Sequence, residues 1–529
     1  MKKLSKLLVL SAIGMSLPSL VACNANKDNE IAKAGRLSIV YYPGGYGNEY
    51  LHAFCKNFLA QKKGVSPDEI KSGKDYILKA DPDITYGEDY YITSPSRCPD
   101  IIISNRMSAK DVTQGYVSSL DEVYETVIHT SSGDMTIQDY TMREAAEQFS
   151  LQIRRGQTDK HFFAIPWTAI PLSIAYNNTL LRQIPHTSDL PVGLDALDGE
   201  GKWERAPQTV DELKACFEDA KAFNSNLTRF GWAATNGTHW FESLITTWWA
   251  QKQGVDTPHA YPDEGSYYDF WNYSGPEIFA QTGLQDALAT IQDLLIDTST
   301  HKYKNSYPTV GSMSIKQSQQ AFAEGKALFC LTGDFFEKEY ASFIQQSGYE
   351  FKMMRVPAID GAVQNEDHST KQLTFLNISS CAYVPTKAKN KDLAKEFLAY
   401  TCKEDNCMLM SEMTGAIRPF KYDARESEHY SEFSSFTKSV CDLFYDADDY
   451  LVKFPRNVAV ENISPVYLYE NVAENIFCNC DYYTVISSLL TLTPRQIMLT
   501  GTSTFDSVWK RANKAFQEWK RIYPDYYHD

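Results

Sequence analysis

The sequence of 529 residues lacks the short motifs that mark several large classes of enzyme. It contains no G-x-x-x-x-G-K-[ST] nucleotide loop, no H-E-x-x-H zinc motif and no G-x-S-x-G nucleophile elbow. Gly44-Gly45-Tyr46-Gly47 lacks the third glycine of a dinucleotide-binding turn. The carboxylate pair of a glycosidase has no fixed spacing, so that chemistry stays open. We expect no catalytic residues and no cofactor.

Paired cysteines and long apolar runs are also scarce. The eleven cysteines form no C-x-x-C pair, and Cys478 and Cys480 are too close for the usual zinc spacing. The sequence therefore predicts no metal site and fixes no disulfide, although a Cys55–Cys98 bridge stays open. Beyond the N-terminal segment, no apolar run reaches the ~18 residues of a membrane span.

Basic residues are in the minority. Lysine and arginine number 51 against 67 aspartates and glutamates, which gives a formal net charge of −16 at pH 7. An acidic surface repels nucleic acid and argues against that partner. The composition, 43% hydrophobic and 13% aromatic, is that of a globular protein. The acidic run 446–449 lacks the glycine and spaced glutamate of an EF-hand loop, so we interpret it as a solvated acidic face.

The N-terminus has the pattern of a lipoprotein signal sequence. Three lysines are followed by an apolar run, and Leu20-Val21-Ala22-Cys23 has the form of a lipobox. We expect 1–22 to be a signal peptide, 23–35 a flexible tether, and Cys23 the attachment point of a lipid. The lipid would hold the protein at the extracellular or periplasmic face of the cell membrane. An ordinary secretory signal with a chance cysteine is the alternative.

Short apolar runs alternate with amphipathic segments along the chain, which predicts parallel sheets covered by helices on both faces. Thr209 followed by Glu212 predicts a capping box, Gly325 predicts a helix end, and the pair Trp248-Trp249 is expected in the core. The predicted strands are 37–42, 99–105, 172–177, 327–331 and 382–385.

Six segments occur in the order typical of the extracellular solute-binding proteins of ABC importers, the family that includes maltose-binding protein. Each segment alone is a weak signal of the family, but six of them in order behind a lipobox form a specific one. The chain resembles this family over about residues 36–425, with an apparent insertion at 64–97 and only a loose match over the last hundred residues. The six segments are 40–58, 98–104, 164–167 with 175–177, 207–213, 321–333 and 384–398.

This resemblance implies an α/β fold of the periplasmic-binding-protein type (type II). In this fold two hinged lobes, each with a central sheet flanked by helices, close on a ligand. By the same resemblance we place lobe 1 at 36–158 and 351–405, and lobe 2 at 159–350 and 406–529.

Candidate ligand contacts follow the carboxyl ends of the predicted strands, where open α/β sheets bind ligands. The resemblance points to the same loops. Their aromatic rings and their Asp, Asn and Arg side chains suit the apolar faces and hydroxyl groups of a sugar. We predict contacts from Tyr46, Asn48, Ser104, Asn105, Arg106, Trp167, Asn236, His239, Trp240, Asp334, Phe335 and Tyr467, with Arg418 as a further candidate.

Several of these residues have a structural alternative. Tyr46 is otherwise a surface loop residue, and Asn105 or Arg106 a turn cap. Trp167 is otherwise part of a hinge core, and His239 a packing residue of a helix.

The resemblance implies a substrate-binding subunit that captures an extracellular solute and delivers it to a membrane permease pair driven by an ATPase. The aromatic content favours a sugar or oligosaccharide, although related proteins carry polyamines, iron or phosphate esters. We expect a monomer. The alternative function is that of a secreted, lipid-anchored glycoside hydrolase or another polysaccharide-handling enzyme.

The lipobox generates a direct prediction. Cys23→Ala should move the protein from the membrane fraction to the soluble fraction, because the sequence offers no other apolar anchor. Cell fractionation of wild type and variant measures this, with a high-salt wash as the control for adsorption. A variant that stays in the membrane fraction after that wash would contradict the prediction.

Overall fold

The fold is known from a computed structural model, which describes residue 31 and residues 33–452 with short gaps. Cys23, Arg106, Asn236, His239, Trp240 and Tyr467 lie outside the described residues, as do Cys478 and Cys480. The gaps are 85–88, 106, 108–110, 113, 152–160, 234–240, 269–280, 298, 301 and 379.

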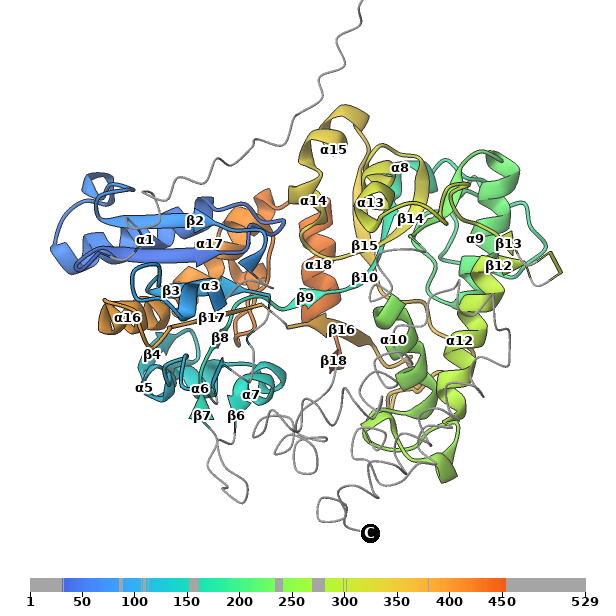
Figure 1. The fold of residues 1–529 in the computed structure, drawn as a ribbon. Coiled ribbons are helices and arrows are strands. Elements are labelled where there is room, and N and C mark those ends of the chain that lie inside the picture. Colours follow the sequence, from blue (N-terminus) through green and yellow to red (C-terminus); the bar gives the residue numbers. More distant parts are fainter. Residues whose placement is uncertain are drawn as a thin grey trace, which may run out of the picture.

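The first lobe is built on a five-stranded sheet, on the left of Figure 1. The first strand, β1, pairs in parallel with β2 and β3, whereas β17 is antiparallel to β3 and β8. Both β1 and β3 are buried along their whole length, as their continuous apolar sequences predict. The sheet order is β2 (Tyr76–Ala80), β1 (Leu37–Tyr41), β3 (Ile101–Ser104), β17 (Cys381–Tyr383) and β8 (Ile165–Pro166).

Helices α1 (Glu49–Lys63), α16 (Lys391–Thr401) and α17 (Glu404–Thr414) pack together in this lobe. Asp100, at the start of β3, ties three of its elements together. Its buried carboxylate accepts hydrogen bonds from the backbone and hydroxyl of Ser38 in β1, and from the backbone of Asn390, which precedes α16.

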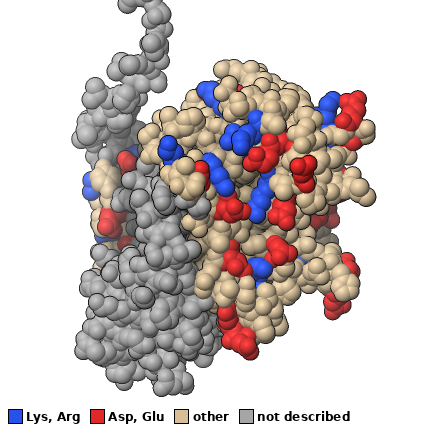
Figure 2. Space-filling view, turned by 90° about the vertical axis from the view of Figure 1, so that its right-hand side faces the viewer, with Lys and Arg blue, Asp and Glu red and all other residues tan. Residues whose placement is uncertain are grey.

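The second lobe has a four-stranded sheet, on the right of Figure 1. Its central strands are fully buried, and the Trp248-Trp249 pair lies in the core as predicted. On the side of the molecule shown in Figure 2, acidic and basic side chains are interspersed rather than separated by sign. The sheet order is β11 (Thr228–Gly231), β14 (Ala327–Thr332), β10 (Ser173–Asn177) and β15 (Phe351–Met354). Its longer helices are α9 (Val210–Phe223), α10 (Phe241–Gln253), α12 (Thr282–Leu295), α13 (Ile315–Ala323) and α18 (Ser435–Tyr445).

The two lobes are joined through a small three-stranded sheet at the centre of Figure 1. Strand β9 (Ile170–Pro171) leads from β8 of the first sheet to β10 of the second. Strand β16 (Leu373–Asn377) leads back from β15 to β17 and pairs antiparallel with β9. Strand β18 (Asp449–Val452) completes the sheet beside β16. The structure therefore has the predicted hinged, two-lobed α/β architecture.

Shorter elements complete the described chain. They are η2 (Pro67–Glu69), α3 (Asp89–Ile92), α5 (Asp121–Tyr124), β4 (Val127–Thr130), β5 (Gly133–Thr136), α6 (Ile137–Tyr140), α7 (Arg143–Phe149), β6 (Ser150–Leu151), β7 (His161–Phe162), α8 (Asn178–Leu181), η4 (Pro262–Glu264), β12 (Ile296–Asp297), β13 (Lys302–Tyr303), α14 (Phe336–Glu339), α15 (Ala341–Ser347), η6 (Ala424–Glu426) and η7 (Tyr430–Glu432).

The predicted lobe boundaries shift in the structure. Strand β8 belongs to the first sheet and β15 to the second, and α17 packs against α1 of the first lobe. The reason is that the chain changes lobe at β9, at β16 and between α17 and α18. The pattern of a strand or helix in the sequence does not tell which lobe it joins.

Two local predictions also differ. Thr209 caps α9 by accepting from the backbone N–H of Glu212, but the Glu212 carboxylate accepts from Gln208 and Gly193 instead of closing a capping box. Arg205 holds that carboxylate in place. Cys55 and Cys98 are free, buried thiols and form no bridge.

Asp219 of α9 fastens a long loop to the second lobe. Its fully buried carboxylate accepts from Trp203 Nε1 at 2.9 Å and from the backbone N–H groups of Thr187 and Ser188 at 2.8 and 2.7 Å. His186 Nδ1 lies 2.9 Å away. Burial alone would raise the pKa of Asp219, but the hydrogen bonds outweigh burial and lower it.

Asp219→Asn should lower the free energy of unfolding by roughly 2–4 kcal/mol at pH 7, because buried donors lose a charged acceptor. The native-state pKa is lowered, so this contribution is present above the ordinary Asp pKa and is lost as pH falls through the native value. The gap between wild type and variant should therefore shrink in acid. Urea unfolding at pH 7 and pH 3 measures it. The exposed neighbour Glu218, changed to Gln, is the control. An equal loss in both variants would contradict the assignment.

Candidate functional site

The loop after β1 meets the corner after β14 where the two lobes touch. Tyr46 of the first lobe donates its hydroxyl hydrogen to Asp334 Oδ1 of the second at 2.5 Å. The rings of Tyr46 and Phe335 meet edge to face, with centroids 6.5 Å apart. Tyr46 is 8% exposed and Asp334 is 2% exposed, whereas Phe335 is half-buried. Tyr46 thus contacts Asp334 and Phe335, which follow it by almost 290 positions in the sequence. All three were predicted site residues.

Asp334 is electrostatically unusual. Burial raises its pKa to about 7, although the hydrogen bond from Tyr46 and the backbone at Ile417 and Phe335 act in the opposite direction. Its second carboxyl oxygen, Oδ2, is buried and has no hydrogen-bond partner among the described residues. Burial also raises the pKa of Tyr46, and the charge of Asp334 adds to that shift. Asp334 therefore keeps its proton to a higher pH than an exposed aspartate does.

Two glycines permit close packing here: Gly45 where the lobes meet, and Gly333 where the corner after β14 packs against the hinge strand β9. A Cβ on Gly45 would lie 2.8 Å from Cβ of Phe335 and 3.2 Å from Oε2 of Glu339. A Cβ on Gly333 would lie 2.7 Å from the side chains of both Ile170 and Phe335. Both distances are too short for a side chain, so glycine is required for this packing.

Trp167 lies deeper, at the hinge. It is 2% exposed, and its indole Nε1 donates to the hydroxyl of Tyr50 at 3.2 Å. The guanidinium carbon of Arg418 lies 4.5 Å from the centre of the Trp167 ring. Arg418 is fully buried and donates to the carbonyl oxygens of Trp167 and Thr401. The geometry favours the hinge-core alternative for Trp167.

The remaining described candidates follow the neighbouring strands β1 and β3. Asn48 is partly exposed, and its amide donates to the Tyr41 hydroxyl at 2.9 Å. Ser104 is fully buried opposite Cys381, and the partly exposed Asn105 follows it. Because β1 and β3 are parallel, their carboxyl ends share one edge of the sheet. The ligand contacts of Asn48, Ser104 and Asn105 stay predictions.

Sequence reasoning missed two residues of this region. Tyr50 supports Trp167, and Glu339 borders Gly45. Glu339 follows Phe335 by four positions, a helical spacing that places both side chains on one face, so the signal was present in the sequence.

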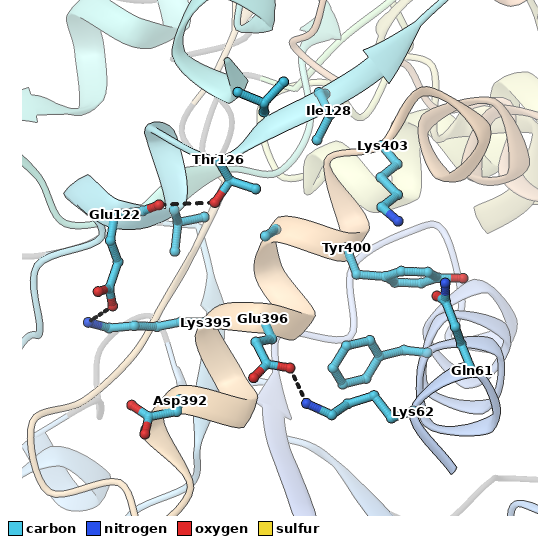
Figure 3. A pocket seen from close by; sticks show the side chains of 14 residues that line it. Gln61, Lys62, Glu122, Thr126, Ile128, Asp392, Lys395, Glu396, Tyr400 and Lys403 are labelled. Carbon is cyan, nitrogen blue, oxygen red and sulfur yellow. Dashed lines mark hydrogen bonds and ion pairs between the residues drawn. The ribbon is translucent and has the colours of Figure 1, made fainter. Parts of the chain in front are cut away.

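A separate surface groove of about 550 Å³ lies wholly on the first lobe, between α1, α5, β4 and α16 (Figure 3). Four of its six charged side chains form two ion pairs. Lys395 contacts Glu122 at 2.5 Å, and Lys62 pairs with Glu396. This groove offers no residue from the second lobe and lies apart from the contact between Tyr46 and Asp334.

The acidic run 446–449 has separate partners for its carboxylates. Asp446 pairs with Arg425, Asp448 accepts from the backbone of Gln372, and Asp449 pairs with Lys371.

Within the described ranges, no group of three or more His, Cys, Asp or Glu side chains is placed to hold a metal ion. No helix in the same ranges has the length and apolar character that a membrane crossing requires.

Two hinged α/β lobes that meet at aromatic and carboxyl side chains define a protein built to close on a ligand. The family model of bacterial extracellular solute-binding proteins matches residues 95–437. The chain belongs to this family, and its role is substrate binding. The family supports the predicted binding role and gives no support to the alternative of a glycoside hydrolase.

Solved structures share the fold at low sequence identity. The GacH receptor of Streptomyces glaucescens GLA.O, solved unliganded and with acarbose, has a TM-score of 0.56 at 13% identity, covering 92% of this chain and 99% of that one. RafE in complex with raffinose has a TM-score of 0.54 at 13% identity, and the match covers 90% of this chain and 98% of RafE. A probable secreted solute-binding lipoprotein from Streptomyces coelicolor has a TM-score of 0.55 at 12% identity, covering 91% and 98%. No curated protein matches the sequence.

The packing at Gly45 generates a prediction. Gly45→Ala should push the lobes apart at Phe335 and increase the radius of gyration, because the new Cβ collides with a residue of the other lobe. The free energy of unfolding should change by less than about 1 kcal/mol, since separation relieves the clash. Small-angle X-ray scattering and urea unfolding measure the two effects. Gly44→Ala is the matched control, because its Cβ would contact only Tyr42 of its own lobe. Equal radii for both variants would contradict the prediction.

Proposed function

We propose that this protein is the substrate-binding subunit of an ABC importer and that its ligand is a neutral sugar or oligosaccharide. The observation that carries the proposal is the meeting of Tyr46, Asp334 and Phe335 across the hinged lobes. A ligand held between these loops contacts both lobes at once, and this geometry links capture to closure.

The side chains at the contact suit a sugar. The half-buried Phe335 ring offers an apolar surface for the face of a pyranose, and the partly exposed amides of Asn48 and Asn105 suit its hydroxyl groups. The described part of the site has no cluster of lysines and arginines for a phosphate or another polyanion, since Arg418 is fully buried in the hinge. RafE with raffinose and GacH with acarbose show this fold holding such molecules in other proteins.

Ligand capture shifts the equilibrium between an open and a closed form of the protein. The open and closed forms interconvert about the hinge strands, and the ligand stabilises the closed form by its contacts to both lobes. The closed form then docks on a membrane permease pair driven by an ATPase. The protein does no chemistry on its ligand in this proposal.

The proposal includes the location of the protein. Its family is extracellular. A lipid on Cys23 of the lipobox would keep the protein near the permease as a monomer, tethered through residues 23–35.

A ligand panel followed by one substitution tests the proposal. A thermal-shift panel of raffinose, acarbose, maltose, spermidine, ferric citrate and glycerol phosphate should raise the melting temperature only with the sugars, because a ligand of the folded state stabilises it. Phe335→Ala should then weaken binding of the best sugar by about 5- to 150-fold, the loss of a stacked aromatic contact. The stability of the unliganded protein should hardly change.

Calorimetry and denaturant unfolding of wild type and variant supply these measurements. Phe223→Ala, which removes an exposed ring at the end of α9, is the matched control. Stabilisation by the polyamine, iron or phosphate ester alone would refute the ligand class. Unchanged affinity with a loss of ~3–5 kcal/mol in stability would make Phe335 a core residue.

A further inference from the structure

The bond between Tyr46 and Asp334 joins the lobes through a buried ionisable group. Asp334 belongs to the corner after β14 of the second lobe, and its only hydrogen-bonded side chain among the described residues is Tyr46 of the first lobe. No ion pair within the described ranges involves Asp334. An ionised carboxylate at this position is removed from water without a neighbouring cation to compensate its charge.

The surroundings of Asp334 supply little positive charge. The guanidinium of Arg418, in the segment after α17, donates to the carbonyl oxygens of Trp167 and Thr401. Lys316 and Lys338 are exposed, and Lys338 acts on Glu49 at the rim. The titratable and charged groups that face the contact are Tyr46, Glu49 and Tyr50 from the first lobe, Lys316 from α13, Lys338 and Glu339 from α14, Cys441 from α18, and Arg418.

We propose that Tyr46 and Asp334 form a latch between the lobes that holds better while Asp334 is protonated, because ionisation would place a charge without a cation in this buried contact. The hydrogen bond from Tyr46 favours the ionised form and offsets only part of that cost. The clamp therefore closes more readily in mildly acidic surroundings than in alkaline ones. This inference rests on the hinged clamp of the proposed function, and it adds a regulation of closure that needs no ligand.

The direction follows from proton linkage. Burial in this contact raises the pKa of Asp334 to about 7. Separation of the lobes removes Tyr46 from the contact and should admit water, which would lower that pKa toward its ordinary value of 3.8. The closed form then binds one more proton than the open form between these values. The stabilisation of the closed form is complete below the ordinary value and is lost as pH rises through 7. The ratio of closed to open molecules falls by at most about tenfold per pH unit in that window.

Small-angle scattering of the unliganded, complete chain at pH 5, 6, 7 and 8 tests the latch. The wild type should expand as pH rises, with a fall of roughly 10- to 100-fold in the ratio of closed to open molecules between pH 5 and pH 8. Asp334→Asn, which keeps the acceptor for Tyr46 but cannot ionise, should stay compact at every pH. Tyr46→Phe should be more open than wild type at pH 5.

Asp442→Asn is the matched control, because burial also raises the pKa of this carboxyl group, but Asp442 lies on α18 among residues of the second lobe only. It should retain the pH response of the wild type. Glu339→Gln should reduce the response without abolishing it, since burial raises the pKa of Glu339 beside the same contact. A wild-type radius that is constant from pH 5 to pH 8 would overturn the latch. So would an Asp334→Asn variant that still expands, or a response that disappears in Glu339→Gln instead. Since no sugar is added, these outcomes are independent of the ligand panel.

Discussion

The antiparallel pairing of β9 with β16 is the constraint on which the rest of the structure depends. These strands carry the chain between the lobes in opposite directions, and their pairing fixes these two crossings side by side. The chain crosses a third time between α17 and α18. A pair of adjacent strands can bend together while each lobe stays rigid. The loops after β1 and β14 belong to different sheets, so their relative position follows from the angle at this hinge.

The contacts around Arg418 connect the segments that form the hinge. A fully buried guanidinium is costly unless its donors find acceptors. Here Nε and Nη1 donate to the carbonyl oxygens of Trp167 and Thr401, while Nη2 has no hydrogen-bond partner among the described residues. The ring of Trp167 covers one face of the cation. Tyr50 connects the same tryptophan to α1. The segment after α17 is therefore tied to β8 and to the first lobe at the point where the lobes move relative to each other.

Lobe contact at Tyr46 and Asp334 relates ligand binding to closure. Aromatic rings and polar side chains on both sides give a ligand contacts that exist only when the lobes are together. Gly45 lets the two surfaces come within van der Waals distance, and Gly333 lets the corner after β14 pack against Ile170 of the hinge. A buried carboxyl group without a cation nearby makes the same contact sensitive to protonation. In the proposed function, binding and closure share one set of residues.

The sequence by itself determined the strands, several helix ends, the family and the loops that carry candidate site residues. Continuous apolar runs such as Leu37–Tyr41 specify buried strands, and the corner after β14 could be placed because it follows such a run directly. Only the tertiary structure decided which side chains meet. Tyr46 and Asp334 are brought together by the hinge and not by spacing, and Trp167 lies in the hinge core because Arg418 and Tyr50 cover it. The lobe boundaries also depended on the fold. The two-residue β9 is too short to show a pattern, and the apolar run of β16 does not tell which sheet the strand joins.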